Sequence, residues 1–249
     1  MIPFYFGDKK RRLFGIYEPA APRSGGKRSA VLCYPWGSEY IHAHRAFKQL
    51  AVRLSSAGVN TLRFDFFGTG DSGGEMEDAD LATWEADIEL AIEELRSIVD
   101  STRVSLIGLR LGATLAARVA ALHPREVDSL VLWDPVLSGS DYLASLGAAS
   151  APSSDGSLEV DGFRLTARMQ RELRTIALTP PLVPPGVRGV TIVTDRGAAS
   201  ARPARPRQGN AEPSGACEVM TAVRPWVEDP DRMGAVPAEV VRRIVDWFA

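Results

Sequence analysis

Short apolar runs alternate with longer segments of helical periodicity along the first 135 residues of the chain. The apolar runs predict strands at residues 11–17, 29–34, 59–66, 104–107 and 130–133. The segments between them carry apolar residues at helical spacing and predict helices at residues 43–57, 79–98 and 111–122. Several strands are apolar at every position, which is typical of strands buried on both faces. The alternation therefore predicts an α/β fold with a mostly parallel central sheet and helices on both faces.

The alternation is interrupted after residue 135, and we expect a small inserted lid at residues 136–178. Asp161-Gly162 is a strong two-residue turn signal inside this segment. The elements expected in the lid are a short helix at 141–147, a hairpin at 158–165 and a helix near 164–177.

The pattern of the sheet resumes after the lid, so residues 1–135 and 179–249 are expected to form one core. The remaining elements are a strand at 189–194, a strand near 218–223 and a helix at about 237–248. Residues 197–216 are rich in Ala, Arg, Pro and Gly without periodicity, which is typical of a mobile loop.

Composition excludes several classes of function. The chain has 249 residues and a formal net charge of -2, which predicts no polyanionic partner such as nucleic acid. No apolar run reaches the roughly 18 residues that a membrane-spanning helix needs. Two cysteines and three histidines are poor material for a metal centre, and we expect neither a metal nor a cofactor. In the first ten residues the charges follow a short apolar run, the reverse of the order in a signal peptide. We therefore expect a cytoplasmic location.

The most informative motif is Gly108-Leu109-Arg110-Leu111-Gly112, which follows a predicted strand and opens a predicted helix. It has the outline of a nucleophile elbow, Gly-x-Ser-x-Gly, in which a strained turn displays one side chain. Here the displayed residue is arginine. A guanidinium has no nucleophilic form in a protein and stays charged at physiological pH.

Two further segments accompany the elbow: Tyr34-Pro35-Trp36-Gly37 after one strand, and Asp65-x-x-Gly68-x-Gly70-x-Ser72 after the next. Together the three segments resemble the α/β-hydrolase superfamily over nearly the whole chain. The nearest resemblance is to bacterial serine-aminopeptidase-like hydrolases, including exosortase-associated proteins, some of which also carry Gly-Leu-Arg-x-Gly. The resemblance implies the α/β-hydrolase fold.

The resemblance also implies a catalytic triad in the chain order nucleophile, acid, histidine. The acid would follow the sixth or seventh strand, where Asp134 and Asp195 stand. The histidine would lie between the last strand and the last helix, but no histidine follows His123. The chain therefore has a degenerate triad in which two of the three members are missing.

The glycine-rich segment matches two other motifs by coincidence of letters. Gly70-Asp71-Ser72-Gly73-Gly74 spells the surroundings of a trypsin-like serine, but such enzymes are double β-barrels, not alternating α/β chains. Gly68-x-Gly70-x-x-Gly73 matches a dinucleotide fingerprint, but acidic residues 75–78 follow it instead of a helix start. Asp65 and Asp71 are expected to brace this loop through backbone hydrogen bonds.

Two roles are open for Arg110. It can form an internal salt bridge with Asp134, which should emerge from a neighbouring strand. It can also bind a carboxylate, phosphate or enolate, helped by the backbone N–H groups of Trp36 and Leu111.

The loop after the strand at 29–34 should border the same pocket. It offers Glu39 and Tyr40 as substrate-binding residues, together with His42 and His44. His44 is the candidate general acid or base because histidine titrates near neutral pH. The alternative is that His44 begins an exposed helix and has no chemical role.

Three functions remain open from the sequence. The first is a non-serine-type enzyme or auxiliary acting on an acyl or carboxylated substrate in a biosynthetic pathway, with Arg110 holding the anion and His44 or Asp134 moving protons. The second is a pseudo-hydrolase that binds a ligand or serves as a scaffold. The third is a residual ester or thioester hydrolase.

Overall fold

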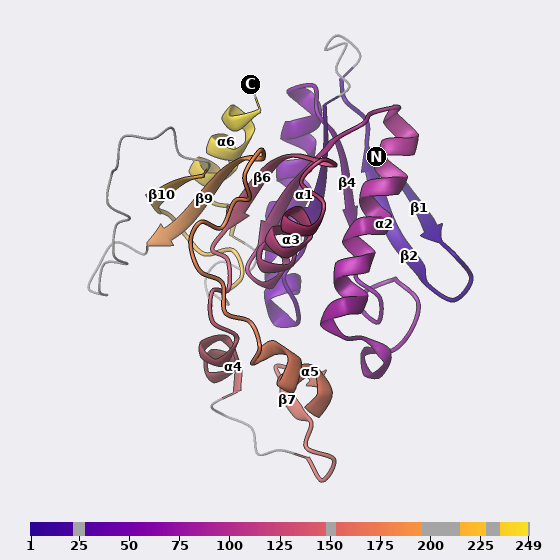
Figure 1. Ribbon diagram of the computed structural model, residues 1–249, viewed down its shortest axis with the longest axis vertical. Helices are drawn as coiled ribbons and strands as arrows, with labels where there is room; N and C mark the ends of the chain where they lie inside the picture. Colours follow the sequence, from indigo (N-terminus) through magenta and orange to yellow (C-terminus); the bar gives the residue numbers. More distant parts are fainter. Residues whose placement is uncertain (22–27, 148–152, 196–214, 228–234, 249) are drawn as a thin grey trace.

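A computed structural model describes residues 1–21, 28–147, 153–195, 215–227 and 235–248. Within these residues, eight strands form one sheet in the order β1-β2-β4-β3-β5-β6-β9-β10 (Figure 1). Neighbouring strands from β4 to β10 are parallel, and β2 pairs antiparallel with both β1 and β4. The strands are β1 (Ile2–Gly7), β2 (Arg12–Glu18), β3 (Ser29–Cys33), β4 (Asn60–Phe64), β5 (Val104–Leu109), β6 (Val127–Trp133), β9 (Arg188–Asp195) and β10 (Ala216–Thr221).

Helices cover both faces of this sheet, as the alternation predicts. One face packs against α1 (Ser38–Ser56) and α6 (Ala238–Trp247), and the other packs against α2 (Leu81–Val99) and α3 (Leu111–Leu122). Alternate residues of β6 pack on opposite faces of the sheet. Leu130 and Leu132 lie on the side of α2 and α3, and Val131 and Trp133 lie on the side of α1 and α6. This is the α/β-hydrolase architecture that the motifs imply.

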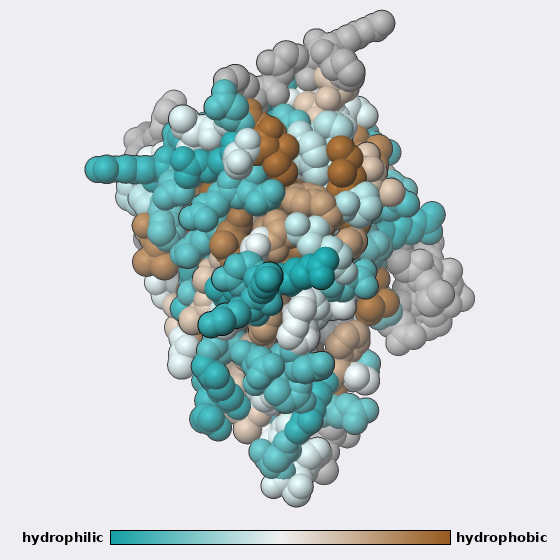
Figure 2. Space-filling model, turned by 90° about the vertical axis from the view of Figure 1, so that its right-hand side faces the viewer, coloured by the Kyte–Doolittle hydropathy of each residue, from teal (hydrophilic) through white to brown (hydrophobic). Residues whose placement is uncertain are grey.

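The segment between β6 and β9 lies apart from the sheet, at the bottom of Figure 1. On the face shown in Figure 2, this lowest part of the molecule is largely hydrophilic. The predicted hairpin at 158–165 is confirmed, while the helix predicted near 164–177 is shorter because residues 163–165 belong to a strand. Its role as a lid stays a prediction. The elements of this segment are α4 (Gly139–Gly147), β7 (Leu158–Val160), β8 (Phe163–Leu165) and α5 (Ala167–Leu173).

The structure differs from the sequence prediction in two other elements. β1 was not predicted, because it is an edge strand whose residues are mostly exposed and show no clear apolar alternation. α1 begins at Ser38 instead of residue 43, directly after Gly37, whose φ of 68° turns the chain out of β3 and into the helix.

Some expectations concern parts of the chain that the structure leaves undescribed. Most of the loop predicted at 197–216 lies outside the described residues, and its last residue, Ala216, already belongs to β10. None of the described helices has the length and hydrophobicity needed to cross a bilayer. Among the described side chains, no three His, Cys, Asp or Glu residues are grouped as metal ligands would be.

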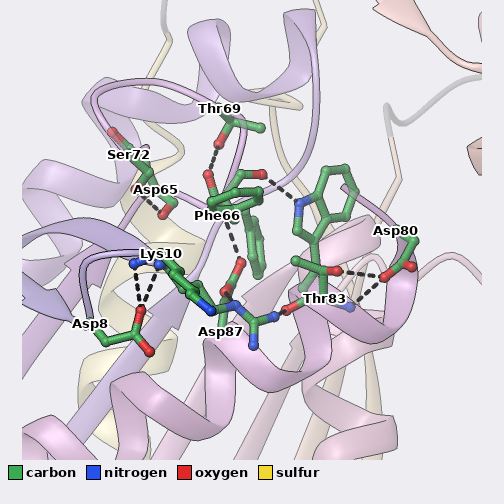
Figure 3. A network of polar contacts seen from close by, with 12 residues as sticks. Asp8, Lys10, Asp65, Phe66, Thr69, Ser72, Asp80, Thr83 and Asp87 are labelled. Carbon is green, nitrogen blue, oxygen red and sulfur yellow. Dashed lines mark hydrogen bonds and ion pairs between the residues drawn. The ribbon is translucent and has the colours of Figure 1, made fainter. Parts of the chain in front are cut away.

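The glycine-rich loop after β4 is fixed by hydrogen bonds to Asp65, and Figure 3 shows the one from Ser72. The Asp65 carboxylate accepts from the Tyr40 hydroxyl at 2.9 Å and from the Asp71 N–H at 3.0 Å. The Ser72 hydroxyl donates to the Asp65 carbonyl oxygen at 2.5 Å. The expected bracing role of Asp65 is therefore confirmed, and Asp71 takes part through its backbone N–H.

The buried carboxylate of Asp87 fastens the same loop to α2 and also pairs with Arg11 (Figure 3). Asp87 is fully buried; one carboxylate oxygen accepts the Phe67 N–H at 2.9 Å, and the other lies 2.8 Å from Nε of Arg11. Burial raises the pKa of the Asp87 carboxyl to about 6, although the Phe67 N–H and Arg11 oppose the shift. The folded protein thus binds this proton more tightly than the unfolded chain, in which an aspartate has a pKa of about 3.9.

The free energy of unfolding should therefore depend on pH through Asp87. Its contribution is most favourable below pH 4 and decreases as the pH rises through about 6, by roughly 3 kcal/mol at about 1.4 kcal/mol per pKa unit. We expect the stability of the wild type relative to Asp87→Asn to fall by about 2 kcal/mol between pH 4 and pH 7, measured by urea denaturation. A difference that stays constant over this range would contradict the assignment.

Candidate functional site

The turn between β5 and α3 displays Arg110 in a strained backbone conformation. Arg110 has φ 54° and ψ -121°, a region that side chains other than glycine rarely occupy, and its N–H donates to the carbonyl of Trp133 at 3.0 Å. Glycines make the turn possible: a Cβ on Gly112 would lie 2.3 Å from the carbonyl oxygens of Cys33 and Tyr34. The turn therefore has the geometry of an elbow, with arginine at its apex.

Arg110 forms an ion pair with Glu39 at the start of α1. Nε of Arg110 lies 2.9 Å from Oε1 of Glu39, and the hydroxyl of Tyr142 donates to Oε2 at 3.0 Å. Glu39 is 6% exposed. Burial raises the pKa of its carboxyl, and the neighbouring Arg110 and Tyr142 oppose this shift. The carboxylate on α1 is thus held by one cation from the start of α3 and one hydroxyl donor from α4.

The expected salt bridge between Arg110 and the Asp134 carboxylate is wrong. Both carboxylate oxygens of Asp134 are bound by Thr194, from its N–H at 2.9 Å and from its hydroxyl at 2.7 Å. Arg110 reaches only the backbone carbonyl of Asp134, at 3.5 Å. The reason is the strand order: Asp134 follows β6, and its side chain turns toward the neighbouring β9 instead of back toward β5.

Two aromatic rings complete the surroundings of the guanidinium. Its central carbon lies 5.5 Å from the centre of the Tyr142 ring and 5.4 Å from that of Trp226. Both distances are within the range of cation–π attraction. Trp226 belongs to the stretch between β10 and α6, where the family resemblance would place a histidine.

A cavity of about 540 Å³ opens beside this group, and we call it the arginine cavity. Because the Arg110 side chain remains 21% exposed, it can meet a ligand there. The residues that line the arginine cavity include Glu39, Ile41, His42, Arg110, Phe163 and Trp226.

The two expected anion-binding N–H groups belong to Trp36 and Leu111, and neither residue lines the arginine cavity. Among the described residues, no acceptor is found for the N–H of Trp36 or of Leu111. Leu111 is the first residue of α3, where helical N–H groups have no partner within the helix. The Leu111 side chain itself is buried, and Trp36 lines a second cavity next to the first.

The early start of α1 corrects the expected role of His44. Residues two positions apart point to nearly opposite sides of a helix, whereas residues three or four apart share a face. His42 accordingly lines the arginine cavity together with Glu39, while His44 packs against the rings of Tyr34 and Tyr40. His44 is therefore not placed to act at Arg110.

The sequence did not single out Tyr142 or Trp226, which come from the inserted segment and the C-terminal stretch. A helix predicted to begin at Ser38 would have placed Glu39 and His42 on the same face. No local pattern reveals the contacts of Tyr142 with Glu39 and of Trp226 with Arg110. Each joins two residues that are more than 100 positions apart in the chain.

The comparison with known protein families agrees with this geometry. Residues 40–249 match the family described as serine aminopeptidase, S33. The chain belongs to this family of α/β hydrolases.

Individual relatives match only part of the chain. The uncharacterized protein Rv2307c of Mycobacterium tuberculosis is 37% identical over 143 residues, which cover 57% of this chain and 46% of that protein. The human mitochondrial palmitoyl-protein thioesterase ABHD10 is 30% identical over 108 residues, covering 43% of this chain and 33% of that protein. In both cases the match spans less than half of the relative's length.

Solved structures share the fold over nearly the whole chain. Est1E from Butyrivibrio proteoclasticus, with ferulic acid bound, has a TM-score of 0.65 and 18% identity, covering 98% of this chain and 97% of that one. The thioesterase domain from the curacin biosynthetic pathway has a TM-score of 0.60 and 14% identity, covering 99% and 98%. At this level of identity, the likeness concerns the fold alone.

The hydrogen bond from Tyr142 to the buried Glu39 carboxylate can be tested by removing one hydroxyl. Tyr142→Phe keeps the ring but leaves Oε2 of Glu39 without its donor, and we expect a loss of about 2 kcal/mol in the free energy of unfolding. Tyr17→Phe is a matched control, because its hydroxyl donates to the neutral amide oxygen of Asn60 and should cost about 1 kcal/mol. Equal losses in the two variants, measured by chemical denaturation, would contradict the special role of Tyr142.

Proposed function

We propose that this chain is a non-hydrolytic member of its family, a pseudo-hydrolase that binds a small acyl or carboxylate ligand in the arginine cavity. The observation that carries the proposal is the placement of Arg110. Glu39 holds its Nε, and the rest of the guanidinium borders a cavity with only one further hydrogen bond among the described residues, a long one to the carbonyl of Asp134. A guanidinium in this position is suited to a carboxylate.

The groups required for serine-type hydrolysis are missing. Arg110 replaces the hydroxyl at the apex of the turn, and the chain has no histidine after His123. The remaining acid, Asp134, directs both carboxylate oxygens to Thr194. Because a triad works as a unit, the absence of its nucleophile and its base removes most of the rate.

The proposed ligand class follows from the charge of the site and from the relatives. The fixed cation of Arg110 in the lining of the cavity favours a negatively charged or carbonyl oxygen. Among the similar proteins, one solved structure contains ferulic acid, and one relative is named a palmitoyl-protein thioesterase. Both names refer to acyl compounds, which supports the same class for this chain.

A second candidate is an enzyme or auxiliary of a biosynthetic pathway that moves a proton on the bound ligand. The observation in its favour is that His42 lines the arginine cavity. A neutral imidazole beside an anion held by Arg110 could serve as general base. Conversion of a bound ligand by the wild type, lost in His42→Gln, would favour this candidate over binding alone.

Ligand binding should depend on Arg110. We expect Arg110→Ala to weaken the binding of octanoate about 10- to 100-fold, the loss of a hydrogen-bonded charge, measured by isothermal titration calorimetry. Arg118→Ala is the matched control, because Arg118 lies on the same helix and pairs with Glu85 outside the cavity.

A second variant covers the case in which Arg110→Ala fails to fold. Removing the cation alone leaves the buried Glu39 carboxylate without its ion-pair partner, which is costly. The double variant Arg110→Gln/Glu39→Gln removes both charges and should bind octanoate as weakly as the single variant. Unchanged affinity in a folded double variant would refute the proposal.

Restoring the apex hydroxyl should not restore hydrolysis. We expect Arg110→Ser to cleave p-nitrophenyl acetate and a matching thioester no faster than the wild type, because no histidine stands between β10 and α6, where the triad needs its base. A robust esterase signal in Arg110→Ser, or in the wild type, would instead support a residual ester or thioester hydrolase.

A further inference from the structure

A second cavity adjoins the arginine cavity and differs from it in character. It has a volume of about 260 Å³ and is more enclosed, and we call it the apolar cavity. The two cavities share Ile41 and Phe163. The apolar cavity lies between the loop after β3, the glycine-rich loop after β4 and the tip of the β7–β8 hairpin, and its main apolar side chains are Trp36, Ile41, Phe66, Met76 and Phe163.

The polar side chains of Tyr40, Asp65 and Thr69 around the apolar cavity are occupied by hydrogen bonds within the protein, and Arg164 pairs with carboxylates outside the cavity lining. The Tyr40 hydroxyl donates to Asp65, and the Thr69 hydroxyl donates to the carbonyl of Phe66 at 2.7 Å. Asp65 also accepts the N–H of Asp71. A polar ligand group would have to break one of these bonds, so the apolar cavity favours an apolar occupant.

Phe163 stands at the junction of the two cavities. Its ring lies 6.2 Å from that of Trp36, at an edge-to-face angle. Two polar contacts hold the hairpin in this place: Ser38 donates to Asp161 at 2.8 Å, and Arg164 pairs with Glu77 at 2.7 Å. The ring is thereby fixed between the start of α1 and the loop after β4.

We infer that the ligand is an amphipathic acid whose carboxylate lies beside Arg110 and whose apolar tail passes Phe163 into the apolar cavity. This inference rests on the proposed function. At roughly 30 Å³ for each small group, the apolar cavity holds about eight non-hydrogen atoms. The tail is therefore a single aromatic group or a medium-length chain, shorter than a palmitoyl chain, and Phe163 and Met76 set its size.

The test is a series of straight-chain carboxylates from butanoate to dodecanoate, titrated calorimetrically into the wild-type protein. We expect the affinity to rise about fourfold with each methylene, the usual gain for burying that group, and to level off near nonanoate. Met76→Trp should narrow the apolar cavity and move the levelling point to shorter acids. Phe163→Ala should open the junction and raise the affinity for acids with branched or bulkier tails.

Ile98→Ala is the control for these variants, because Ile98 is an exposed apolar residue of α2 outside both cavities. Equal affinity for all chain lengths, with binding still dependent on Arg110, would overturn this inference and leave the proposed function intact. If the affinity depends on chain length in the same way in Met76→Trp, Phe163→Ala and the wild type, the inference is also overturned. If Arg110→Ala leaves the affinity unchanged at every chain length, the proposed function itself is overturned.

Discussion

The ion pair between Arg110 and Glu39 connects the parts of the molecule that meet at the carboxyl end of the sheet. Arg110 stands at the start of α3, where a cation opposes the helix dipole, and in a backbone conformation that costs energy. Glu39 is buried at the start of α1, where a lone carboxylate would be costly. The attraction between the two charges offsets the electrostatic cost of placing each of them there. Tyr142 connects the inserted segment to this ion pair through its hydrogen bond to Glu39.

A second ion pair, with a buried carboxylate, supports the glycine-rich loop. Arg11 and Asp87 join the turn before β2 to α2, and Asp87 also binds the N–H of Phe67 at the start of the glycine-rich loop. This loop forms one wall of the apolar cavity through Phe66, Gly68, Thr69 and Gly70. The shape of that cavity thus depends on a carboxylate that does not touch it.

The elbow combines the strained backbone of the motif with an arginine at its apex. The close approach of Gly112 to β3 and the positive φ at position 110 are properties of the backbone, and they leave the side chain at the apex free to vary. With arginine there, the turn presents a charge where a nucleophile would stand in the resembling enzymes. The partners of that charge, Glu39 and the rings of Tyr142 and Trp226, come from three other segments.

The sequence by itself determined the alternating architecture, the two-sided helical cover, the β7–β8 hairpin and the elbow with arginine at its apex. These features follow from periodicity, turn residues and close-packed glycines, all of which act over a few neighbouring positions. Only the tertiary structure decided that Arg110 pairs with Glu39 and not with Asp134, and that His42 and not His44 faces the cavity. Those outcomes depend on where α1 begins and on which strand lies beside β6, and no local pattern specifies the distance between charges that are far apart in the chain.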